Sequence, residues 1–361
     1  MNDMIQDMID WIEEHLFEGF SLMKLSEVMG YSSYYCSFKF HQITGISIKR
    51  YITLRKTYLS SISLSETDER IIEIALKHGY SSQEAFSRAF KEIFGVSPNA
   101  FRLSPEPLQS YVKLTMNEAR GYDMDISKKL RIEDLQKHVD EHFDHEVLNI
   151  LNGQHMYEEF SSQQLMGKSD YAPFNEMCVH DTFKTIFSDS FKQVRAAGHQ
   201  VSLEDYEAIT VAPLEKTLFS KEYQYIVLWF GEEMFCQMNL ITVLAYLEQT
   251  SFKGTIYYHA VREQTYDVQE TEITLGSYYE IYEAVLVDHC MPDEELMPVL
   301  YQGIKLYLEL LQNDNEITKY IQTHQHLSQN EIVRNLLHLF PQYGLGDTQY
   351  LALISATQIK D

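Results

Sequence analysis

Apolar residues recur every three to four positions along the first hundred residues, which is the spacing that buries one face of a helix. The pattern predicts a helix over residues 1–17, a short helix that Ser21 can cap, and a third helix over 33–43. The turn Gly30-Tyr31-Ser32 separates the last two helices. A short helix, a tight glycine turn and a second helix make up a helix-turn-helix unit.

The same arrangement returns about fifty residues later. After a longer helix over 48–64, apolar residues over 71–76 predict another short helix, and residues 83–94 predict the helix that follows it. The turn Gly79-Tyr80-Ser81 lies between them, and Gly95-Val96-Ser97-Pro98 ends the second. The two Gly-Tyr-Ser turns mark an internal repeat, so we expect residues 1–102 to form an all-α module of two helix-turn-helix units.

The second unit also carries a longer motif. Its parts are Ile71-Ile72-Glu73-Ile74-Ala75, Gly79-Tyr80, Phe86-Ser87-Arg88-Ala89-Phe90-Lys91, Gly95-Val96-Ser97-Pro98 and Phe101-Arg102. This motif resembles the signature of the AraC/XylS family of transcription regulators, and the resemblance covers residues 1–102. It implies double-stranded DNA as a partner. The first unit departs from the family pattern at Phe38, where the family often has Arg or another long polar residue.

Beyond residue 130 the pattern changes to short apolar runs. These runs predict strands over 146–151, 174–179, 225–230 and 255–261. Helices are expected over 185–197 and 233–249. Strand, helix and strand at this spacing form a βαβ unit, which predicts a parallel sheet. From Glu294 the chain becomes helical again, over 296–311, 315–324, 328–339 and 348–354.

These patterns predict a multidomain chain. Its parts are an AraC-type DNA-binding module over 1–102, a connector over 103–130, an α/β domain with a parallel or mixed sheet over 131–293, and a helical C-terminal subdomain over 294–361. The α/β part is also similar to a bacterial α/β domain family of unknown function. That similarity rests on Ile150-Leu151-Asn152-Gly153, Trp229-Phe230-Gly231 and Gln237-x-Asn239-Leu240.

Charge is distributed unevenly between these parts. The chain has a net charge of −24, but residues 1–102 hold 11 Lys and Arg against 13 Asp and Glu, a net of −2. The other 259 residues carry −22. The near-neutral part can bind DNA if its cations lie on one face. The acidic part would be repelled by phosphates and is better suited to a small ligand or a protein partner.

Cysteine spacing and hydropathy predict a cytoplasmic protein. Cys36, Cys178, Cys236 and Cys290 are far apart and include no C-x-x-C pair, which argues against a disulfide framework or a cysteine zinc site. No apolar run reaches eighteen residues, and the acidic N-terminus lacks a signal-peptide pattern. We therefore expect no membrane partner.

In helix-turn-helix proteins the N-terminal residues of the second helix contact bases in the major groove. Matching the chain to the family places this face of the second unit at Ser82, Gln83, Glu84, Ser87 and Arg88. Arg pairs with guanine, Gln with adenine and Glu with cytosine. The matching face of the first unit is Ser33, Tyr34, Ser37 and Phe38, which offers hydroxyl groups and apolar contact to a thymine methyl group. The alternative for Tyr34 and Phe38 is a place in the hydrophobic core.

Cations near these faces are candidates for phosphate contacts. They are Lys39, Lys49, Arg50, Arg55 and Lys91. The alternative for each is an ordinary solvated surface charge.

The α/β part offers candidate effector-binding residues. Asn152 and Gly153 follow a strand, at the end where α/β folds place their ligands. Trp229, Gln237 and Asn239 belong to the short motifs quoted above. The alternatives are an ordinary turn at Asn152-Gly153 and a core position for Trp229.

Two further clusters of side chains have residue types suited to binding a ligand. The chain has no G-x-G-x-x-G, P-loop, G-x-S-x-G or H-E-x-x-H motif, so no catalytic residue, cofactor or metal is expected. His138, His142 and His145 have spacing that could hold a metal, but a charged linker helix is favoured. Tyrosines over 257–282 beside Glu280 and Glu283 could bind a lipophilic cation, although a core role for the rings is favoured.

The sequence thus predicts a DNA-binding transcription regulator. Its acidic α/β region would sense a small-molecule effector or mediate formation of a homodimer. One alternative is a DNA-binding module fused to an enzyme domain of unknown reaction. Another is a protein-interaction platform whose acidic surface binds a basic partner.

Overall fold

A computed structural model of the chain describes residues 2–116, 146–176, 180–261 and 268–358. Within these residues the chain divides into two compact units, each described here by itself. The first unit comprises residues 2–116, 297–302 and 309–358, and the second comprises 146–296 and 303–308. A helical helix-turn-helix module at the N-terminus is thus followed by a region with a mixed sheet and helices.

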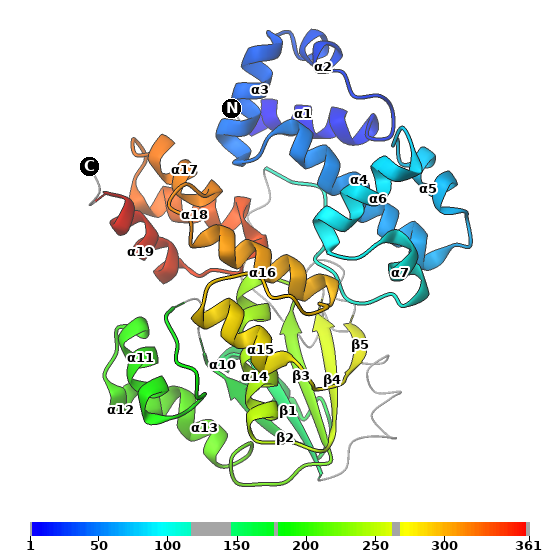
Figure 1. Cartoon of the computed structure of the whole chain (residues 1–361). Helices are drawn as coiled ribbons and strands as arrows, with labels where there is room; N and C mark the ends of the chain where they lie inside the picture. The colour runs from blue at the N-terminus through cyan, green and yellow to red at the C-terminus, as the bar shows by residue number, and fades with distance from the viewer. Residues whose placement is uncertain (1, 117–145, 177–179, 262–267, 359–361) are drawn as a thin grey trace. The chain divides into compact units, whose positions relative to one another are not determined.

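Helices in the blue-to-cyan part of Figure 1 form the N-terminal module. They are α1 (Asn2–Glu14), α2 (Leu22–Met29), α3 (Ser33–Thr44), α4 (Ile48–Glu66), α5 (Ile71–Lys77), α6 (Gln83–Phe94) and α7 (Pro98–Leu103). The pairs α2–α3 and α5–α6 are the two helix-turn-helix units. The long helix α4 connects these two helix-turn-helix units along the chain.

Serine and glycine residues set the ends of these helices in the same way in both units. The side chains of Ser32 and Ser82 accept the backbone N–H three residues on, at the N-termini of α3 and α6. Gly45 and Gly95 end the same helices with φ of 76° and 79°. This left-handed conformation is strained for residues with a Cβ, so glycine is the favoured residue there. The predicted repeat is therefore present, with an offset of fifty residues.

The inward faces of α3 and α6 follow the same offset. Three buried side chains about one turn apart occupy equivalent positions in the two helices, Cys36, Phe40 and Thr44 in α3 and Phe86, Phe90 and Phe94 in α6, and α6 also buries Ile93. The rings of α6 pack edge to face, with centroids 5.6 Å apart for Phe86–Phe90 and 4.8 Å for Phe90–Phe94. This packing leaves the opposite face of each helix exposed.

The segment after α7 packs on the module. Leu108 is buried in the core of the second helix-turn-helix unit. The N–H of Met116 donates to Gln6 at 2.6 Å, and Lys113 forms an ion pair with Asp10 at 2.7 Å. These contacts involve residues that the sequence assigned to a connector over 103–130. The domain boundaries stay predictions, because the remaining connector residues lie outside the described ranges.

The C-terminal helices also belong largely to the first unit. They are α16 (Pro298–Leu310), α17 (Glu316–Thr323), α18 (Gln329–Leu339), a 3₁₀ turn over Pro341–Tyr343 and α19 (Asp347–Gln358). Their own core includes Ile321, Leu336, Phe340 and Tyr350. By its internal contacts the first unit includes residues 309–358 of this segment.

The second unit is built on a five-stranded mixed sheet, counted over its described residues, with the order β2-β1-β3-β4-β5. The strands are β1 (Val147–Asn152), β2 (Asp170–Phe174), β3 (Tyr225–Gly231), β4 (Thr255–Val261) and β5 (Val268–Ile273). β1 to β4 are parallel, and β5 is antiparallel to β4. The predicted βαβ unit is formed by β3, α14 (Met234–Gln249) and β4.

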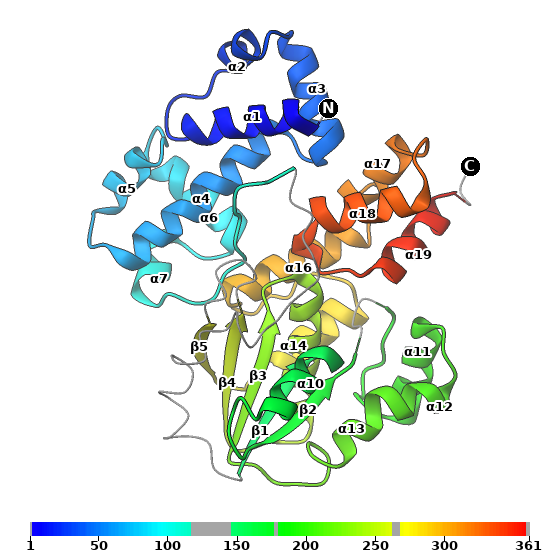
Figure 2. The same cartoon turned by 180° about the vertical axis from the view of Figure 1, so that it is seen from behind.

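Helices cover both faces of this sheet, as Figures 1 and 2 show from opposite sides. α10 (Gln154–Gln163) lies on one face, where Phe160 packs on Trp229 in a cluster with Val147 and Val227. α14 and α15 (Tyr278–Tyr282) lie on the other face. The remaining helical segments are α11 (Asp189–His199), α12 (Leu203–Tyr206), a π-helical turn over Glu207–Val211, α13 (Ala212–Glu215) and a π-helical turn over Glu283–Val287.

One strand prediction needs correction, and one strand was missed. Of the strand expected over 174–179, residues 177–179 lie outside the described residues, and the strand found here is β2, which begins at Asp170 and ends at Phe174. Pro173 lies within it, and a proline is tolerated because β2 is an edge strand that need not donate from every N–H. β5 was not predicted, because its alternating polar residues do not form an apolar run.

Arg55 joins the two ends of the module through a buried ion pair. Its guanidinium donates to both carboxylate oxygens of Glu13 at 2.8 Å and to the carbonyl of Tyr111. Burial alone would raise the pKa of Glu13, but hydrogen bonds from Arg55 and Tyr51 outweigh this effect and lower it. Arg55 therefore connects α4 to α1 and to the segment after α7.

We predict that Arg55→Ala destabilises the first unit by about 3 kcal/mol, because it leaves the Glu13 carboxylate buried without its cation. Urea unfolding followed by Trp11 fluorescence, in a Trp229→Phe background, measures this change. Arg70→Ala is the matched control, since Arg70 pairs with Glu73 on the surface and its loss should barely move the transition. Equal shifts for the two variants would contradict the structural role of Arg55.

Candidate functional site

The exposed face of α6 carries the polar residues predicted to contact bases. Gln83, Glu84 and Arg88 are exposed, and Ser87 is half-buried between them. Gln83 and Ser87, like Glu84 and Arg88, are four residues apart and so lie on the same side of the helix. This face (Gln83, Glu84, Ser87 and Arg88, the α6 face) lies opposite the buried phenylalanines.

Ser82 and Glu84 also stabilise the N-terminus of α6. The Ser82 hydroxyl accepts the N–H of Ala85 at 3.2 Å, so its first role is that of a helix cap. The pKa of Glu84 is lowered because its carboxylate accepts hydrogen bonds from its own backbone N–H and from Ser82. Glu84 thus remains ionised at neutral pH, where it can accept a hydrogen bond but also repels phosphates.

The corresponding face of α3 is aromatic. Tyr34 is 80% exposed and Phe38 is 48% exposed, and their rings are stacked with centroids 6.1 Å apart. The alternative that placed these two rings in the hydrophobic core is therefore wrong. Cys36, Phe40 and Thr44 fill the core side of α3 instead. The offset of fifty residues pairs Tyr34 with Glu84 and Phe38 with Arg88.

The serines complete this face (Ser33, Tyr34, Ser37 and Phe38, the α3 face). The Ser33 hydroxyl is already engaged, because it lies 2.9 Å from the hydroxyl of Ser26 on α2. Ser37 is half-buried, on the same side of the helix as Ser33. Tyr31 and Tyr35 add two exposed rings nearby, 5.0 Å apart. The sequence argument missed these two tyrosines, although their helical spacing to Tyr34 and Phe38 was visible.

The predicted phosphate-binding cations have different surroundings. Lys91 and Lys49 are exposed. Lys39 lies over the rings of Tyr35 and Phe38, at 5.9 and 5.7 Å, and donates to Gln42. Arg50 is partly exposed and lies 4.0 Å from Glu92.

Arg55 does not belong to this group. It is 8% exposed and its guanidinium is used by Glu13 and Tyr111, so it presents no free edge to a phosphate. The prediction of a phosphate contact at Arg55 is corrected to a structural role. The sequence around Arg55 does not indicate this ion pair, because the partner carboxylate of Glu13 lies 42 residues earlier.

In the second unit, three of the predicted effector-binding residues meet at the carboxyl ends of β1 and β2. The side-chain amide of Asn239 donates to Asn152 at 3.1 Å and to the carbonyl of Glu176 at 3.0 Å. Asn152 donates to the sulfur of Cys236 at 2.9 Å. Gly153 follows with φ of 88° and is the N-cap residue of α10. Asn152, Gly153 and Asn239 therefore form one polar sheet edge.

Gln237 and Trp229 are placed differently. Gln237 donates to the carbonyl of Gly231 and to the hydroxyl of Tyr258, while its buried Oε1 accepts no hydrogen bond from the part of the chain that the structure describes. Trp229 is fully buried, and its indole N–H donates to Asn149 at 2.9 Å. Trp229 is therefore a core residue, and its prediction as an effector contact is corrected.

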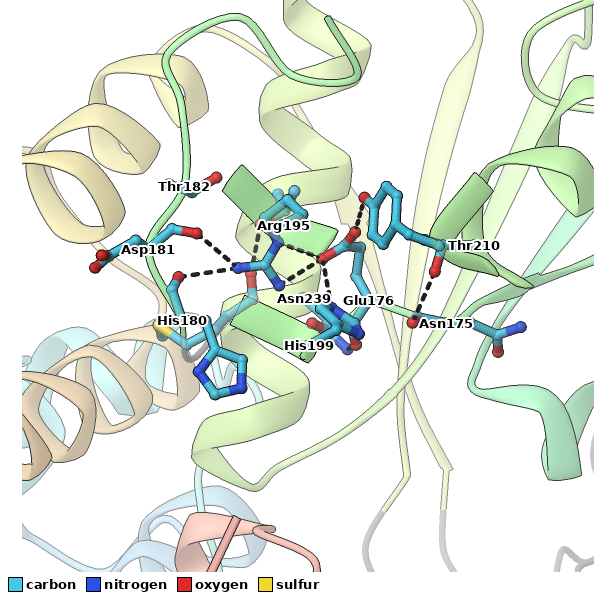
Figure 3. A network of polar contacts seen from close by, with 12 residues as sticks. Asn175, Glu176, His180, Asp181, Thr182, Arg195, His199, Thr210 and Asn239 are labelled. Atoms are coloured by element: carbon cyan, nitrogen blue, oxygen red, sulfur yellow. Dashed lines mark hydrogen bonds and ion pairs between the residues drawn. The ribbon is translucent and has the colours of Figure 1, made fainter. Parts of the chain in front are cut away.

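A buried ion pair holds the loop after β2 beside this edge, as Figure 3 shows. The guanidinium of Arg195 donates to the Glu176 carboxylate at 2.7 and 2.5 Å, and to the carbonyls of His180 and Asp181. The hydroxyl of Tyr206 donates to the same carboxylate. Burial would raise the pKa of Glu176, but the Arg195 charge outweighs it and the pKa falls to about 2. Sequence reasoning missed this network, since no motif relates Glu176 to Arg195.

The tyrosines over 257–282 differ in burial. Tyr258 and Tyr282 are fully buried, which agrees with the core role favoured for these rings, whereas Tyr257, Tyr278 and Tyr279 are partly exposed. Glu283 pairs with Lys184 at 3.1 Å. The cluster of His138, His142 and His145 lies outside the described residues, as does Cys178. Among the residues that the structure describes, no cluster of His, Cys, Asp and Glu could hold a metal ion, and no helix is long and apolar enough to cross a membrane.

Known proteins resemble the N-terminal part of the chain. A family model described as a helix-turn-helix domain matches residues 25–104. The right origin-binding protein of Escherichia coli K12 is 37% identical over 103 residues, which are 28% of this chain and 36% of that protein. The chain thus spans about a third of the length of this relative.

Two further proteins resemble part of the chain. The multiple antibiotic resistance protein MarA of Salmonella typhimurium is 35% identical over 113 residues, which are 31% of this chain and 89% of MarA. A solved AraC-type transcriptional regulator from Chromobacterium violaceum is 23% identical, covers 28% of this chain and 95% of its own, and has a TM-score of 0.27. With MarA matched over most of its length, the chain belongs to the AraC/XylS family of DNA-binding transcription regulators.

Proposed function

We propose that this regulator binds a specific duplex sequence through two chemically different faces. The α6 face would form hydrogen bonds to base edges, and the α3 face would make apolar contacts. The observation that carries the proposal is the difference between equivalent exposed positions: Arg88 and Glu84 in α6 correspond to Phe38 and Tyr34 in α3.

The side-chain chemistry supports this division. Arginine can donate two hydrogen bonds to guanine and glutamine can pair with adenine, both in the major groove. A phenylalanine ring has no hydrogen-bonding group, so its contribution there is contact with the thymine methyl group. Lys39, Lys49, Arg50 and Lys91 would contact phosphates, which adds affinity without sequence preference.

We predict that Arg88→Ala weakens binding to the preferred duplex by about 1–3 kcal/mol and relaxes the preference at one base pair. The preferred duplex is selected from a random pool with the full chain, and binding is measured by fluorescence anisotropy. The control is Arg334→Ala, which removes the same charge from an exposed position on α18. If both variants lose affinity equally at every sequence, Arg88 acts only through charge and the assignment of the α6 face fails.

We also propose that the second unit senses a small-molecule effector at its polar sheet edge. In the order β2-β1-β3-β4-β5, β1 has β2 on one side and β3 on the other, and the connecting helices α10 and α14 leave to opposite faces. Ligands of open α/β sheets bind at the carboxyl ends of the strands where this reversal occurs. Asn152 and Gly153 follow β1, and Gln237 lies near the end of β3 with a buried oxygen that has no partner among the described residues. Such an oxygen costs free energy unless a ligand or water pairs with it.

A bound effector should therefore protect the sheet edge from hydrogen exchange. We expect compounds that raise the melting temperature of the full chain to slow amide exchange at Gly153 and over 231–237, and to change DNA affinity. Protection should be lost in Asn239→Ala, while Gln249→Ala, at the far end of the same helix, serves as the control. Stabilising compounds that protect only other segments would contradict this site. A homodimer without any effector, detected by sedimentation, would support the dimerisation role instead.

A further inference from the structure

Two aromatic rings of the C-terminal segment lie on the two equivalent glycines of the N-terminal module. The ring of Phe340, after α18, covers Gly45 at the end of α3 so closely that a Cβ there would overlap it. The ring of Tyr301, on α16, covers Gly95 at the end of α6 in the same way. Gly45 and Gly95 are fifty residues apart and end corresponding helices. All four residues belong to the first unit.

Buried polar groups extend these contacts. The N–H of Val299 donates to the carbonyl of Pro107 at 3.0 Å. Gln109 is 1% exposed; its backbone N–H donates to Gln302 at 2.7 Å, and its side-chain amide donates to the carbonyl of Gln342 at 3.0 Å. The segment after α7 is therefore bonded both to α16 and to the turn after α18. Buried hydrogen bonds of this kind are costly to break, because each leaves polar groups unpaired.

We propose that the C-terminal segment, residues 297–302 and 309–358 of the first unit, acts as a brace. By this we mean that its contacts fix the relative orientation of the two recognition helices, α3 and α6. Phe340 and Tyr301 are its positioning residues: each ring covers the glycine that ends one recognition helix. Gln109 links the two positions, because it is hydrogen-bonded both to Gln302, beside Tyr301, and to Gln342, near Phe340. The inference rests on the proposed function in one respect, since the purpose of the brace is simultaneous base contact by both faces.

The positions of these contacts indicate that the C-terminal segment orients the recognition helices and does not cover the faces that would contact DNA. Each recognition helix has twelve residues and is about 18 Å long at 1.5 Å per residue. The rings lie at its C-terminal end, whereas base contacts come from its N-terminal end. Phe340 is fully buried and forms part of the C-terminal core, with Tyr320 and Tyr343 nearby. The α3 face and the α6 face therefore remain exposed while the brace is in place.

Such a brace would also limit bending of the helix that connects the two helix-turn-helix units. The chain connects the two helix-turn-helix units through one helix, α4, of 19 residues. Helices bend, and a change in angle along α4 would move one recognition helix relative to the other. Two further attachment points, one at each recognition helix, oppose that motion. A small displacement matters, because adjacent base pairs are only about 3.4 Å apart along the duplex.

The first test measures the distance between the recognition helices without DNA. Spin labels are attached to the full chain at Tyr34→Cys and Glu84→Cys, both exposed and equivalent in the repeat, with Cys178 and Cys290 replaced by Ser. We expect a narrow distance distribution in this background and a broad or shifted one after Phe340→Ala or Tyr301→Ala. Tyr301→Phe keeps the ring on Gly95 and should retain the narrow distribution. Phe340→Leu should restore most of it.

The second test uses the duplex selected by the wild-type chain and copies with one or two base pairs inserted between its two contacted segments. The wild type should lose affinity steeply with each insertion. Phe340→Ala and Tyr301→Ala should bind the selected duplex at least about tenfold more weakly, which corresponds to about 1.4 kcal/mol, and should lose most of the dependence on spacing. Tyr301→Phe should behave as the wild type. Circular dichroism verifies that each variant is folded, and Phe340→Val or Tyr301→Val, which likewise removes the ring from its glycine, replaces an alanine variant that is not.

The outcomes separate the two proposals. A wild-type chain that selects no sequence contradicts the proposed function, while the distance measurement still decides on the brace. Unchanged distances and unchanged spacing dependence in both alanine variants overturn the brace. Tighter DNA binding by Phe340→Ala also overturns it, because the segment would then inhibit binding.

Discussion

The geometry of the DNA-binding module depends on the packing that fixes each recognition helix within its helix-turn-helix unit. Three inward side chains one turn apart hold the helix on one side, as Phe86, Phe90 and Phe94 do in α6. A serine cap begins the helix and a left-handed glycine ends it. Because these features settle the orientation of the helix, the residues on its outer face are free to differ. The two copies share the inward pattern and differ on the outside, where Phe38 and Tyr34 replace Arg88 and Glu84.

The same separation between framework and surface recurs in the second unit. There the framework is polar: Arg195 neutralises the buried Glu176, and the Glu176 backbone accepts from Asn239. This network holds the loop after β2 next to Asn152. A buried charge pair with several hydrogen bonds is costly to rearrange, so it gives the sheet edge a fixed shape. A ligand that pairs with Gln237 would meet an edge that is already arranged.

Much of this could be predicted from local sequence. Helix periodicity, serine caps and glycine ends specify the module, because each acts within a few residues. The apolar run over 225–230 likewise predicted a strand, which is β3. Contacts between distant residues could not be predicted. Arg55 appeared to be one more surface cation until Glu13 was placed beside it, and Pro173 concealed an edge strand.

The candidate sites show the same limit. Asn152 and Asn239 were recognised from short motifs, and the fold brings them together. Trp229 came from the same motifs but lies in the core, since exposure is a property of the packed sheet. The rings of Phe340 and Tyr301 cover glycines far away in the sequence, which no pattern within the N-terminal module indicates.

On the proposed function, one fold used twice contacts DNA with different chemistry in its two copies. Base-analogue interference on the selected duplex measures this difference directly. Replacing thymine by uracil removes only the methyl group, and replacing guanine by 7-deazaguanine removes only the N7 acceptor. We expect uracil to weaken binding within the DNA segment contacted by the first helix-turn-helix unit, and 7-deazaguanine to weaken it within the segment contacted by the second helix-turn-helix unit. Equal sensitivity of both segments to both analogues, or the reverse assignment, would contradict it.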